Sequence, residues 1–413
     1  MISAPSWRLT AATLLLLVPA LGSAQQAPKE GGAPALDFSG VLFGSYSYRT
    51  DSAAGAAFGG AHPNQFSVDR AYLTFRMPAG QNGQIRVTTD FFQNTNNQAN
   101  AFYQGWAIRL KYAYGQYTGL HNVFGSGSSL TGRVGLLHTV ITDYEEGFWP
   151  RYLAQVGPDR NGFFPSADAG LAGLLTLGNH WGEVYGTVTA GPGYTSYEKD
   201  RFKDFALRVS LTPFANQDAL NPILRSFSIT PWFYKGLVGS AFQAGGTDQI
   251  GPGENGAITD GLTRDRWGVF TGVRDRRITA GIEFAQRADE SETGSNTVAS
   301  PRVVHGSTGR LVDGFFIARP LEWFNAARHS RFAVIGRYDH FTPNTDPDAV
   351  AYAGTTPSYD YWVLGASYDL SPQLRFALDW QVQNPVDFPA QVPGNVVATP
   401  RQSTLFAHWQ AAF

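Results

Sequence analysis

The residues of this sequence that could do chemistry are charged side chains at alternating positions of short, strand-like segments. The clearest segment is 84–91, where Ile85, Val87 and Phe91 alternate with Arg86, Thr88 and Asp90. A strand places successive side chains on opposite faces, so the charges gather on one face. A charged side chain costs about 2–4 kcal/mol when it faces lipid at the midplane of a bilayer. If the apolar face of this segment meets lipid, its charged face has to meet water.

The same alternation puts charged residues on the wet face of other segments. The candidates are Arg70, Arg76, Arg86, Arg109, Lys111, Arg208 and Arg375, together with the acidic residues Asp90, Asp204, Glu283 and Asp379. Basic residues are in excess in this set, which favours an attraction for anions. The alternative is that the charges only pair with one another or stand in water, as many charges on wet surfaces do.

A further set of charges lies in the long gap 142–167 between two such segments. It comprises Asp143, Glu145, Glu146, Arg151 and Arg160. Acidic side chains that face a basic wall would create a transverse field, which orients polar solutes and sorts ions. The neighbouring Phe148, Trp149 and Tyr152 could contact a sugar face, but we favour a role in anchoring the gap segment against a wall.

The sequence offers no arrangement of groups for catalysis or metal binding. The run Gly125–Ser129 lacks the final glycine of a nucleophile elbow. Asp346 and Asp348 lack the ligand pattern of a calcium site. The eight histidines have no metal-ligand spacing, and we predict that His138 and His408 are interfacial residues. We therefore predict no enzyme activity, no metal and no cofactor.

Alternating segments of about ten residues recur from Phe38 to Phe413, near the length that a tilted transmembrane strand needs. The predicted fold is all-β, a closed antiparallel transmembrane β-barrel of about 16 strands, with 14 or 18 as alternatives. Its lipid-facing residues are predicted to include Ala71, Leu73, Phe75 and Met77; Ile108, Leu110, Tyr112 and Tyr114; Phe205, Leu207, Val209 and Leu211; and Leu374, Phe376, Leu378 and Trp380.

Long and short gaps alternate between these segments. The long gaps lie near 51–65, 95–104, 142–167, 191–201, 236–261, 288–308, 342–357 and 384–401, and short gaps such as 78–83 and 371–372 fall between them. The gaps 118–130, 213–222 and 319–329 are longer than a short turn needs. Bacterial barrels have long extracellular loops and short periplasmic turns, whereas sandwiches and propellers have no such alternation. We therefore predict one barrel over 38–413, with an inward-folded loop at about 142–167.

The last segment is the predicted closing strand. Leu405, Ala407, Trp409, Ala411 and Phe413 share one face of it, and the chain ends on an aromatic ring. In a closed barrel with an even number of strands the last strand pairs with the first, here 38–48. Tryptophans near segment ends are predicted to form an interfacial girdle: Trp106, Trp181, Trp267, Trp362 and Trp409.

Composition and targeting agree with an exported barrel. The mean hydropathy is −0.20, too low for helical membrane spans. The formal net charge of −2 gives no basic surface for nucleic acid. Residues 1–24 are a predicted signal peptide, with Arg8 before an apolar centre and small residues before Gln25. Residues 25–37 are a predicted periplasmic lead-in without a fold of its own.

Several short motifs resemble those of outer-membrane porins, and most of all the phosphate-selective porin O/P family. They are Val-Asp-Arg-Ala-Tyr-Leu at 68–73, Arg-Val-Gly-Leu-Leu at 133–137, Asp-Tyr-Glu-Glu-Gly-Phe-Trp at 143–149, Arg-Phe-Lys-Asp-Phe at 201–205 and Gly-Arg-Tyr-Asp-His-Phe at 336–341. The resemblance implies a bacterial outer-membrane barrel, commonly a homotrimer, that conducts small solutes. Family members that select phosphate line their constriction with Arg and Lys, whereas the loop 142–167 also carries acidic residues. The resemblance further implies that Trp409 and Phe413 form the mark read by the barrel-assembly machinery.

The predicted function is that of an outer-membrane porin for passive diffusion of small hydrophilic solutes or ions, with a preference for anions such as phosphate. The predicted partners are outer-membrane lipid, these solutes, further copies of the chain and the assembly machinery, and not nucleic acid. One alternative is an outer-membrane barrel enzyme of the lipid-hydrolase type, which would need a Ser/His/acid arrangement. The other is a soluble secreted β-rich binding protein, which would be recovered without detergent.

Overall fold

The computed structural model describes residues 36–57, 59–94, 105–196, 198, 200–239, 261–293, 303–325, 329–345, 358–387 and 401–413. The predicted signal peptide, residues 25–35 of the predicted lead-in and the Asp346–Asp348 motif lie outside these residues. Residues 36–413 form one compact unit.

Within the described residues the chain forms sixteen strands, the number that the alternation predicts. They are β1 (Asp37–Arg49), β2 (Asn64–Ala79), β3 (Gly83–Asn94), β4 (Gly105–Gly119), β5 (Ser129–His138), β6 (Ala167–Leu177), β7 (Gly182–Thr189), β8 (Asp204–Leu211), β9 (Ser228–Gly239), β10 (Gly261–Arg274), β11 (Ile278–Thr293), β12 (Val303–Ala318), β13 (Phe332–Thr342), β14 (Ser358–Asp369), β15 (Leu374–Asp387) and β16 (Gln402–Ala412). Short helices are α1 (Ser52–Ala57), α2 (Thr142–Glu145), α3 (Gly157–Arg160), η2 (Gly178–His180), α4 (Pro222–Arg225) and α5 (Leu321–Phe324).

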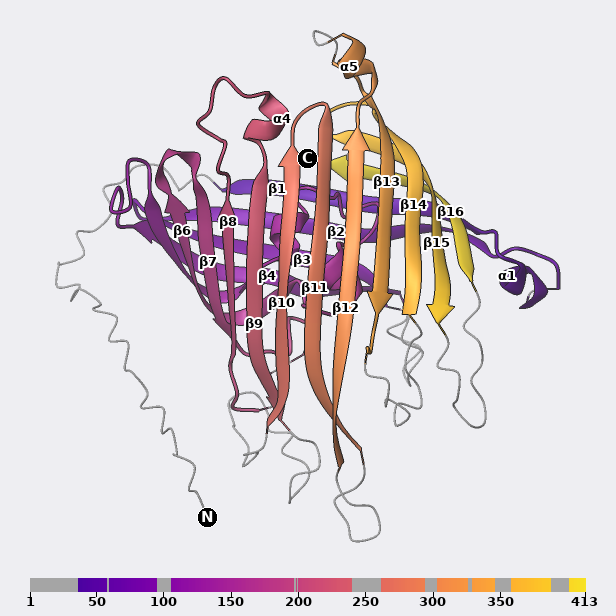
Figure 1. Ribbon diagram of the computed structural model, residues 1–413, viewed down its shortest axis with the longest axis horizontal. Helices are drawn as coiled ribbons and strands as arrows, with labels where there is room; N and C mark the ends of the chain where they lie inside the picture. The colour runs from indigo at the N-terminus through magenta and orange to yellow at the C-terminus, as the bar shows by residue number, and fades with distance from the viewer. Residues whose placement is uncertain are drawn as a thin grey trace. The chain divides into compact units, whose positions relative to one another are not determined.

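The strands form one closed antiparallel barrel in which each strand pairs with its neighbours in sequence (Figure 1). The ring closes between β1 and β16, in register from Val41 opposite Ala412 to Arg49 opposite Thr404. This pairing confirms the predicted partner of the last segment. The seam continues to the last residue, because the amide of Phe413 donates to the carbonyl of Gly40 over 3.0 Å.

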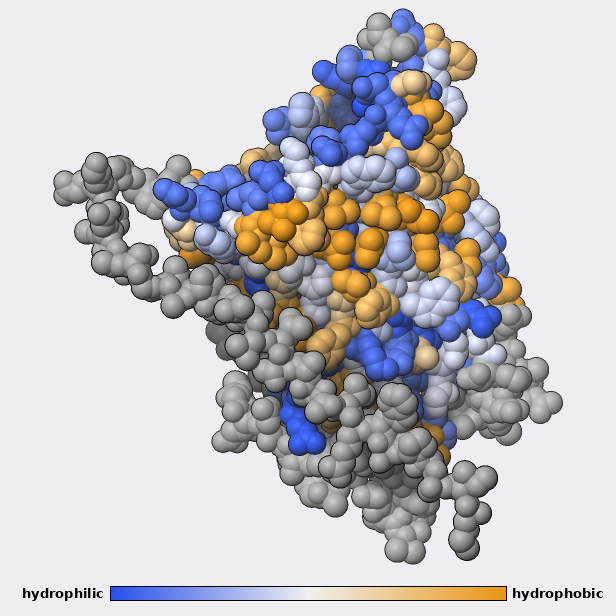
Figure 2. Space-filling model, turned by 60° about the vertical axis from the view of Figure 1, so that its left-hand side comes forward, coloured by the Kyte–Doolittle hydropathy of each residue, from blue (hydrophilic) through white to orange (hydrophobic). Residues whose placement is uncertain are grey.

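The outer face of the barrel is apolar and exposed. Ile108 and Ile282 keep 63% and 65% of their surface exposed, and Phe205 and Leu378 are also exposed. Figure 2 shows an apolar band across one face of the wall, with hydrophilic side chains beyond it. An apolar surface of this extent is costly in water, and it is the surface that a membrane-spanning barrel presents to lipid.

One predicted face is wrong, because strand β4 contains a β-bulge. The register against β3 shifts between Thr88 and Thr89, which pair with Tyr112 and Leu110 and leave Lys111 as the extra residue. A bulge adds one residue to one strand, so the alternation of faces changes its phase after it. Tyr112 and Tyr114 are therefore buried on the inner face rather than exposed to lipid.

The connections differ at the two ends of the barrel. At one end lie residues 80–82, 275–277 and 370–373, together with the longer connections that contain α4 and α5. We call this end the short-turn end; its connections with α4 and α5 lie at the top of Figure 1. The opposite end, which we call the long-loop end, carries the connections that include α1, α2 and α3. No helix among the described residues is long and apolar enough to cross a membrane.

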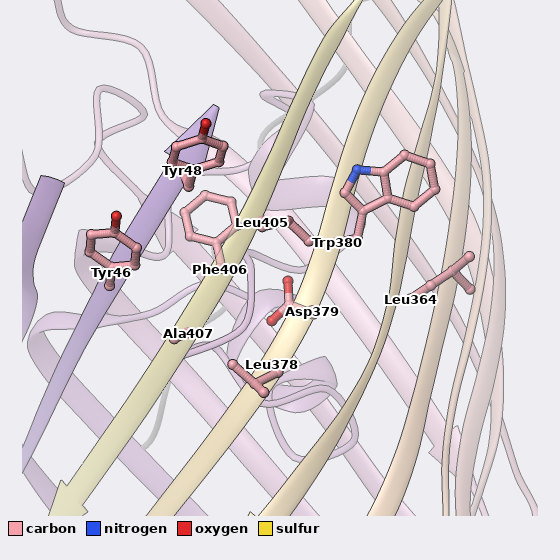
Figure 3. A pocket seen from close by; sticks show the side chains of 9 residues that line it. All are labelled: Tyr46, Tyr48, Leu364, Leu378, Asp379, Trp380, Leu405, Phe406 and Ala407. Carbon is pink, nitrogen blue, oxygen red and sulfur yellow. The ribbon is translucent and has the colours of Figure 1, made fainter. Parts of the chain in front are cut away.

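An outward groove of about 540 Å³ follows the seam between the first and last strands (Figure 3). Ala407 of β16 lies opposite Tyr46 of β1 and Leu378 of β15. Since alanine is smaller than its neighbours, the rings and leucines beside it form the walls of the groove. Trp380 and Leu405 extend these walls toward the long-loop end.

Candidate functional site

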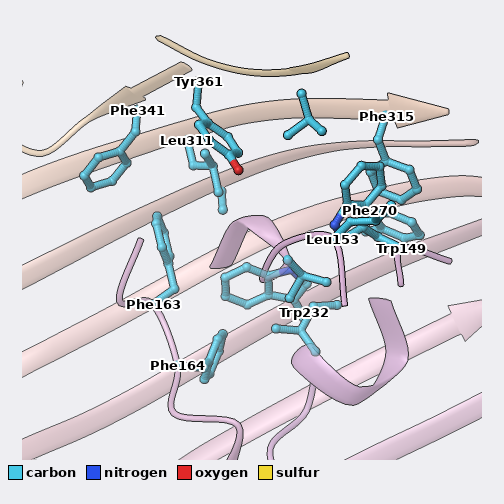
Figure 4. Close-up of a cluster of buried hydrophobic side chains, with 14 of the residues drawn as sticks. Trp149, Leu153, Phe163, Phe164, Trp232, Phe270, Leu311, Phe315, Phe341 and Tyr361 are labelled. Carbon is cyan, nitrogen blue, oxygen red and sulfur yellow. The ribbon is translucent and has the colours of Figure 1, made fainter. Parts of the chain in front are cut away.

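The connection between β5 and β6, residues 139–166, packs against the inner face of the barrel. We call it the inner loop. Trp149 and Phe163 are fully buried. The Trp149 ring lies 5.3 Å from that of Phe315 on β12, and Phe164 lies 5.0 Å from Trp232 on β9 (Figure 4). The aromatic residues of this loop therefore anchor it to strands across the barrel from those that it joins.

Polar side chains of the far wall bind the backbone of the inner loop. Arg337 of β13 donates to the carbonyl of Gln155 over 2.6 Å, and Arg287 of β11 to that of Asn161 over 2.8 Å. Gln381 of β15 donates to the carbonyl of Leu153 over 3.0 Å, and Arg266 of β10 to that of Phe163. Buried backbone carbonyls need such donors when a segment has no regular secondary structure. The far wall thus fixes the path of the loop.

The predicted charged residues of the inner loop have different interaction partners. Asp143 pairs with His138 at 2.8 Å. Arg151 bridges Glu146 and Asp159, the latter at 2.9 Å. Arg160 donates to Gln383 over 2.7 Å and stacks on the Tyr361 ring, 3.7 Å from its centroid.

Glu145 is the exception among these charges, because it is buried against other carboxyl groups. Burial, followed by the nearby Glu283 and Asp313, raises the pKa of Glu145 well above its ordinary value. Glu283 in turn accepts a hydrogen bond of 2.9 Å from the indole of Trp232. The inner loop therefore contacts this part of the wall through a carboxyl group that favours its neutral form.

The predicted basic residues on β2, β3 and β4 face inward as a group. Asp90 is fully buried and accepts from Arg70 over 2.7 Å and from Arg109 over 2.9 Å. Arg86 lies 3.1 Å from the ring nitrogen Nε2 of His138. The Lys111 ammonium lies over the Tyr72 ring, 4.4 Å from its centroid. Two arginines thus share one carboxylate, which leaves a net positive charge on this side.

The remaining predicted wall residues are separated from this group. Arg76 pairs with Asp37 over 3.2 Å near the short-turn end. Arg375 lies 3.4 Å from Asp369, and Asp379 lies 3.2 Å from His408. Arg208 pairs with Glu183 on β7. Of these residues, Arg208 also lies over the Tyr144 ring of the inner loop. The structure therefore gathers only part of the predicted set around that loop.

The two histidines predicted at the membrane interface are on the inner face instead. His138 is buried, and its ring stacks on Tyr112 at 4.0 Å. His408 is buried beside Asp379. Each has a carboxylate partner on another segment, which a single isolated histidine in the sequence gives no means of finding.

Other inward-facing charges were not among the predicted site residues. They include Arg133, Glu183, Arg266, Arg287 and Arg337. The alternation in β10, β11 and β13 was a usable signal for the last three. Arg133 lies between glycines, where the apolar alternation is weak. Within the described part of the chain, no cluster of three or more His, Asp or Glu could hold a metal ion.

A polar cavity of about 390 Å³ lies between the start of the inner loop and the near wall. Its lining residues are Arg133, His138, Thr139, Val140, Asp143, Tyr144, Gly147, Phe148, Leu174, Glu183, Tyr185, Arg208 and Arg274. They come from the inner loop and from β5, β6, β7, β8 and β10. We call this space the lower cavity; it lies toward the short-turn end, where Arg274 ends β10, and the name does not refer to the view in Figure 1.

Comparison with known proteins identifies the type of barrel. No family model and no curated protein matches the sequence. Among solved structures, Salmonella typhi OmpF is 11% identical, covering 92% of this chain and 98% of its own with a TM-score of 0.57. The anion-selective porin from Comamonas acidovorans is 11% identical, with coverages of 92% and 100% and a TM-score of 0.56. The outer-membrane channel DcaP of Acinetobacter baumannii is 12% identical, with coverages of 92% and 97% and a TM-score of 0.56. The chain therefore has the fold of the sixteen-stranded outer-membrane porins.

Proposed function

We propose that this protein is an outer-membrane porin through which small hydrophilic solutes and ions diffuse passively, with a preference for anions. Three features support a channel: the closed barrel, its apolar outer face and the loop that packs inside it. A soluble binding protein would have no use for an outer face of exposed isoleucine and phenylalanine.

The observation that carries the anion preference is the set of inward cations without a carboxylate partner. Among the described residues, Arg86, Lys111, Arg133 and Arg274 have no carboxylate at ion-pair distance, while the acidic side chains of the inner loop mostly pair with its own or neighbouring cations. Unpaired cations on the wall of a narrow aqueous path raise the local concentration of anions. Phosphate is one such anion. Because acidic residues also lie on the loop, we expect the channel to prefer anions in general and not to select phosphate alone.

The proposal also covers export, membrane insertion and assembly of the protein. Export would use the signal peptide 1–24, and insertion would use Trp409 and Phe413 as the mark for the assembly machinery. The assembled form would be a homotrimer in outer-membrane lipid. One structural neighbour, OmpT of Vibrio cholerae, was solved in a trimer form; it is 10% identical to this chain, with a TM-score of 0.52.

Planar-bilayer recording of the refolded protein tests this function. We expect stepwise conductance and, in a salt gradient, a reversal potential of the sign that anion permeation gives. Absence of conductance would overturn the porin, and a cation-selective reversal potential would overturn the anion preference.

The variant Asp90→Asn sharpens the same experiment. It removes the one carboxylate that Arg70 and Arg109 share, so the wall gains a full positive charge. We expect the anion-to-cation permeability ratio to rise by about twofold or more. The exposed pair Lys203–Glu198 supplies the control, because Glu198→Gln changes the charge by the same amount outside the strands.

A further inference from the structure

The lower cavity is lined by two chemically different kinds of side chain. Tyr144 and Phe148 of the inner loop, with Leu174 of β6, supply apolar surface. The rings of Tyr144 and Phe148 are 5.5 Å apart, and Phe148 is supported from behind by Phe270 at 5.0 Å. Guanidinium groups of three strands, from Arg133, Arg208 and Arg274, line the same cavity. A site built in this way matches a solute that is itself half apolar and half charged.

The charges of this cavity do not cancel. Its two acidic residues are already paired, Asp143 with His138 at 2.8 Å and Glu183 with Arg208. Among the described residues, neither Arg133 nor Arg274 has a carboxylate at ion-pair distance. The cavity therefore holds two arginines that are free to bind an anion.

The arginines are also held in position by aromatic rings. The Arg208 guanidinium carbon lies 4.2 Å from the Tyr144 ring centroid, and its buried Nε has no hydrogen-bond partner within the described structure. Arg133 lies 5.5 Å from the ring centroids of both Tyr114 and Tyr185. Stacked, planar guanidinium groups bind a planar carboxylate through two parallel hydrogen bonds.

From this arrangement we infer that the lower cavity is a binding site for a small carboxylate with a flat, apolar body, such as an aromatic monocarboxylate. The carboxylate lies toward Arg133 and Arg274, and the ring lies against Tyr144 and Phe148. An inorganic phosphate would satisfy the arginines but leave the apolar surface in contact with water. A cavity of about 390 Å³ is within the range of small-molecule sites. The inference rests on the proposed porin function, in which a permeating solute binds transiently at this site.

Two measurements on the full-length refolded protein test the site. Isothermal titration calorimetry in detergent measures benzoate binding without any need for conduction, and single-channel recording measures block of the current by the same solute. Acetate has the charge without the ring, benzyl alcohol has the ring without the charge, and phosphate has the charge with a different shape. We expect benzoate to bind and block at concentrations where these three do neither.

The variant Arg133→Gln/Arg274→Gln removes the free charges and leaves the stacked Arg208 in place. We expect its benzoate affinity to fall about tenfold or more, as the loss of charge-assisted hydrogen bonds implies. Arg331→Gln is the matched control, because Arg331 is an exposed arginine at the short-turn end that does not line the cavity. A heat-dependent shift on a gel verifies that each variant forms a barrel.

The outcomes separate the site from the porin function. A protein that conducts but binds benzoate no better than acetate or phosphate overturns the site and leaves the porin standing. A protein that binds benzoate but never conducts retains the site and overturns the porin. Unchanged affinity in the double variant also overturns the site, because the arginines would then carry none of the recognition.

Discussion

Two glycines on the outer face of β1 determine how the first strand meets the last. A Cβ atom at Gly44 would lie 2.3 Å from ring atoms of Trp409, and one at Gly40 would lie 2.3 Å from the Phe413 ring. Gly44 and Trp409 are directly opposite in the register. The rings that close the barrel therefore lie on bare backbone, and any side chain at these two positions would displace them.

Gly44→Ala tests this contact. We expect a loss of about 1–3 kcal/mol in the free energy of unfolding, because overpacking a filled site forces the ring out of place. Urea unfolding in detergent, followed by tryptophan fluorescence, measures it. Gly132→Ala is the control, since a Cβ there meets nothing within 4 Å. Equal losses in the two variants would refute a special role for Gly44.

Single residues also mark where reasoning from the sequence succeeds and where it stops. The faces of β8 follow from simple alternation, and Phe205 is exposed while Arg208 is buried as that pattern predicts. The bulge at Lys111 defeats the same rule, because one extra residue has no mark in the sequence. Partners such as His138 and Asp143 come from different segments, so local alternation says nothing about them.

At the scale of elements, the inner loop is the part that its own sequence determines least. Its length and its charges are visible in the sequence, but its contacts are with distant strands. Arg160 reaches Gln383, 223 positions away, and Arg266 reaches Phe163, 103 positions away. A pattern that repeats every two residues holds no information about such pairs. The path of the loop is therefore determined by its contacts with the far wall, which the sequence of the loop does not reveal.

The contact at Glu145 predicts a dependence of the loop on pH. Its pKa is raised when the loop is packed, so packing favours the protonated form. This contribution is fully present below the ordinary pKa of a glutamate, about 4.3, and is lost as pH rises through the raised value. We expect current fluctuations of single channels to increase as pH rises above this ordinary value, because the loop loosens.

Glu145→Gln keeps the shape of this side chain and removes its titration. The variant should show nearly constant fluctuations over the same pH range, whereas Glu198→Gln, an exposed carboxylate outside the inner loop, should behave as the parent. A pH dependence that persists in Glu145→Gln would assign it to another group.

At the scale of the whole molecule, the number of strands and their order were predictable because they rest on local signals. Alternation gives each strand, and the long and short connections give the order up and down. Closure then follows, because an open sheet of this length would leave two unpaired edges. These short-range patterns thereby bring together residues far apart in the sequence, such as Thr50 and Ser403, whose hydroxyl groups form a hydrogen bond although they are 353 positions apart.

Deletion of Phe413 tests closure as a property of the whole barrel. It removes two backbone hydrogen bonds with Gly40, of 2.8 and 3.0 Å, and the ring that lies 5.8 Å from Phe38. We expect a lower yield of assembled barrel in cells and an unchanged conductance in the molecules that do assemble. Phe413→Tyr keeps the ring and the backbone and should assemble as the parent does. Normal assembly of the truncated chain would remove Phe413 from this role.

The inner loop has a mechanical consequence as well. It starts and ends on β5 and β6 and is bonded to β10, β11, β13 and β15 on the opposite side. A barrel whose opposite walls are joined by a hydrogen-bonded loop resists flattening. Lateral pressure from lipid then acts on the inner loop and its hydrogen bonds before it can narrow the pore. We expect the cross-section of this pore, and with it the conductance, to change little between bilayers under low and high tension.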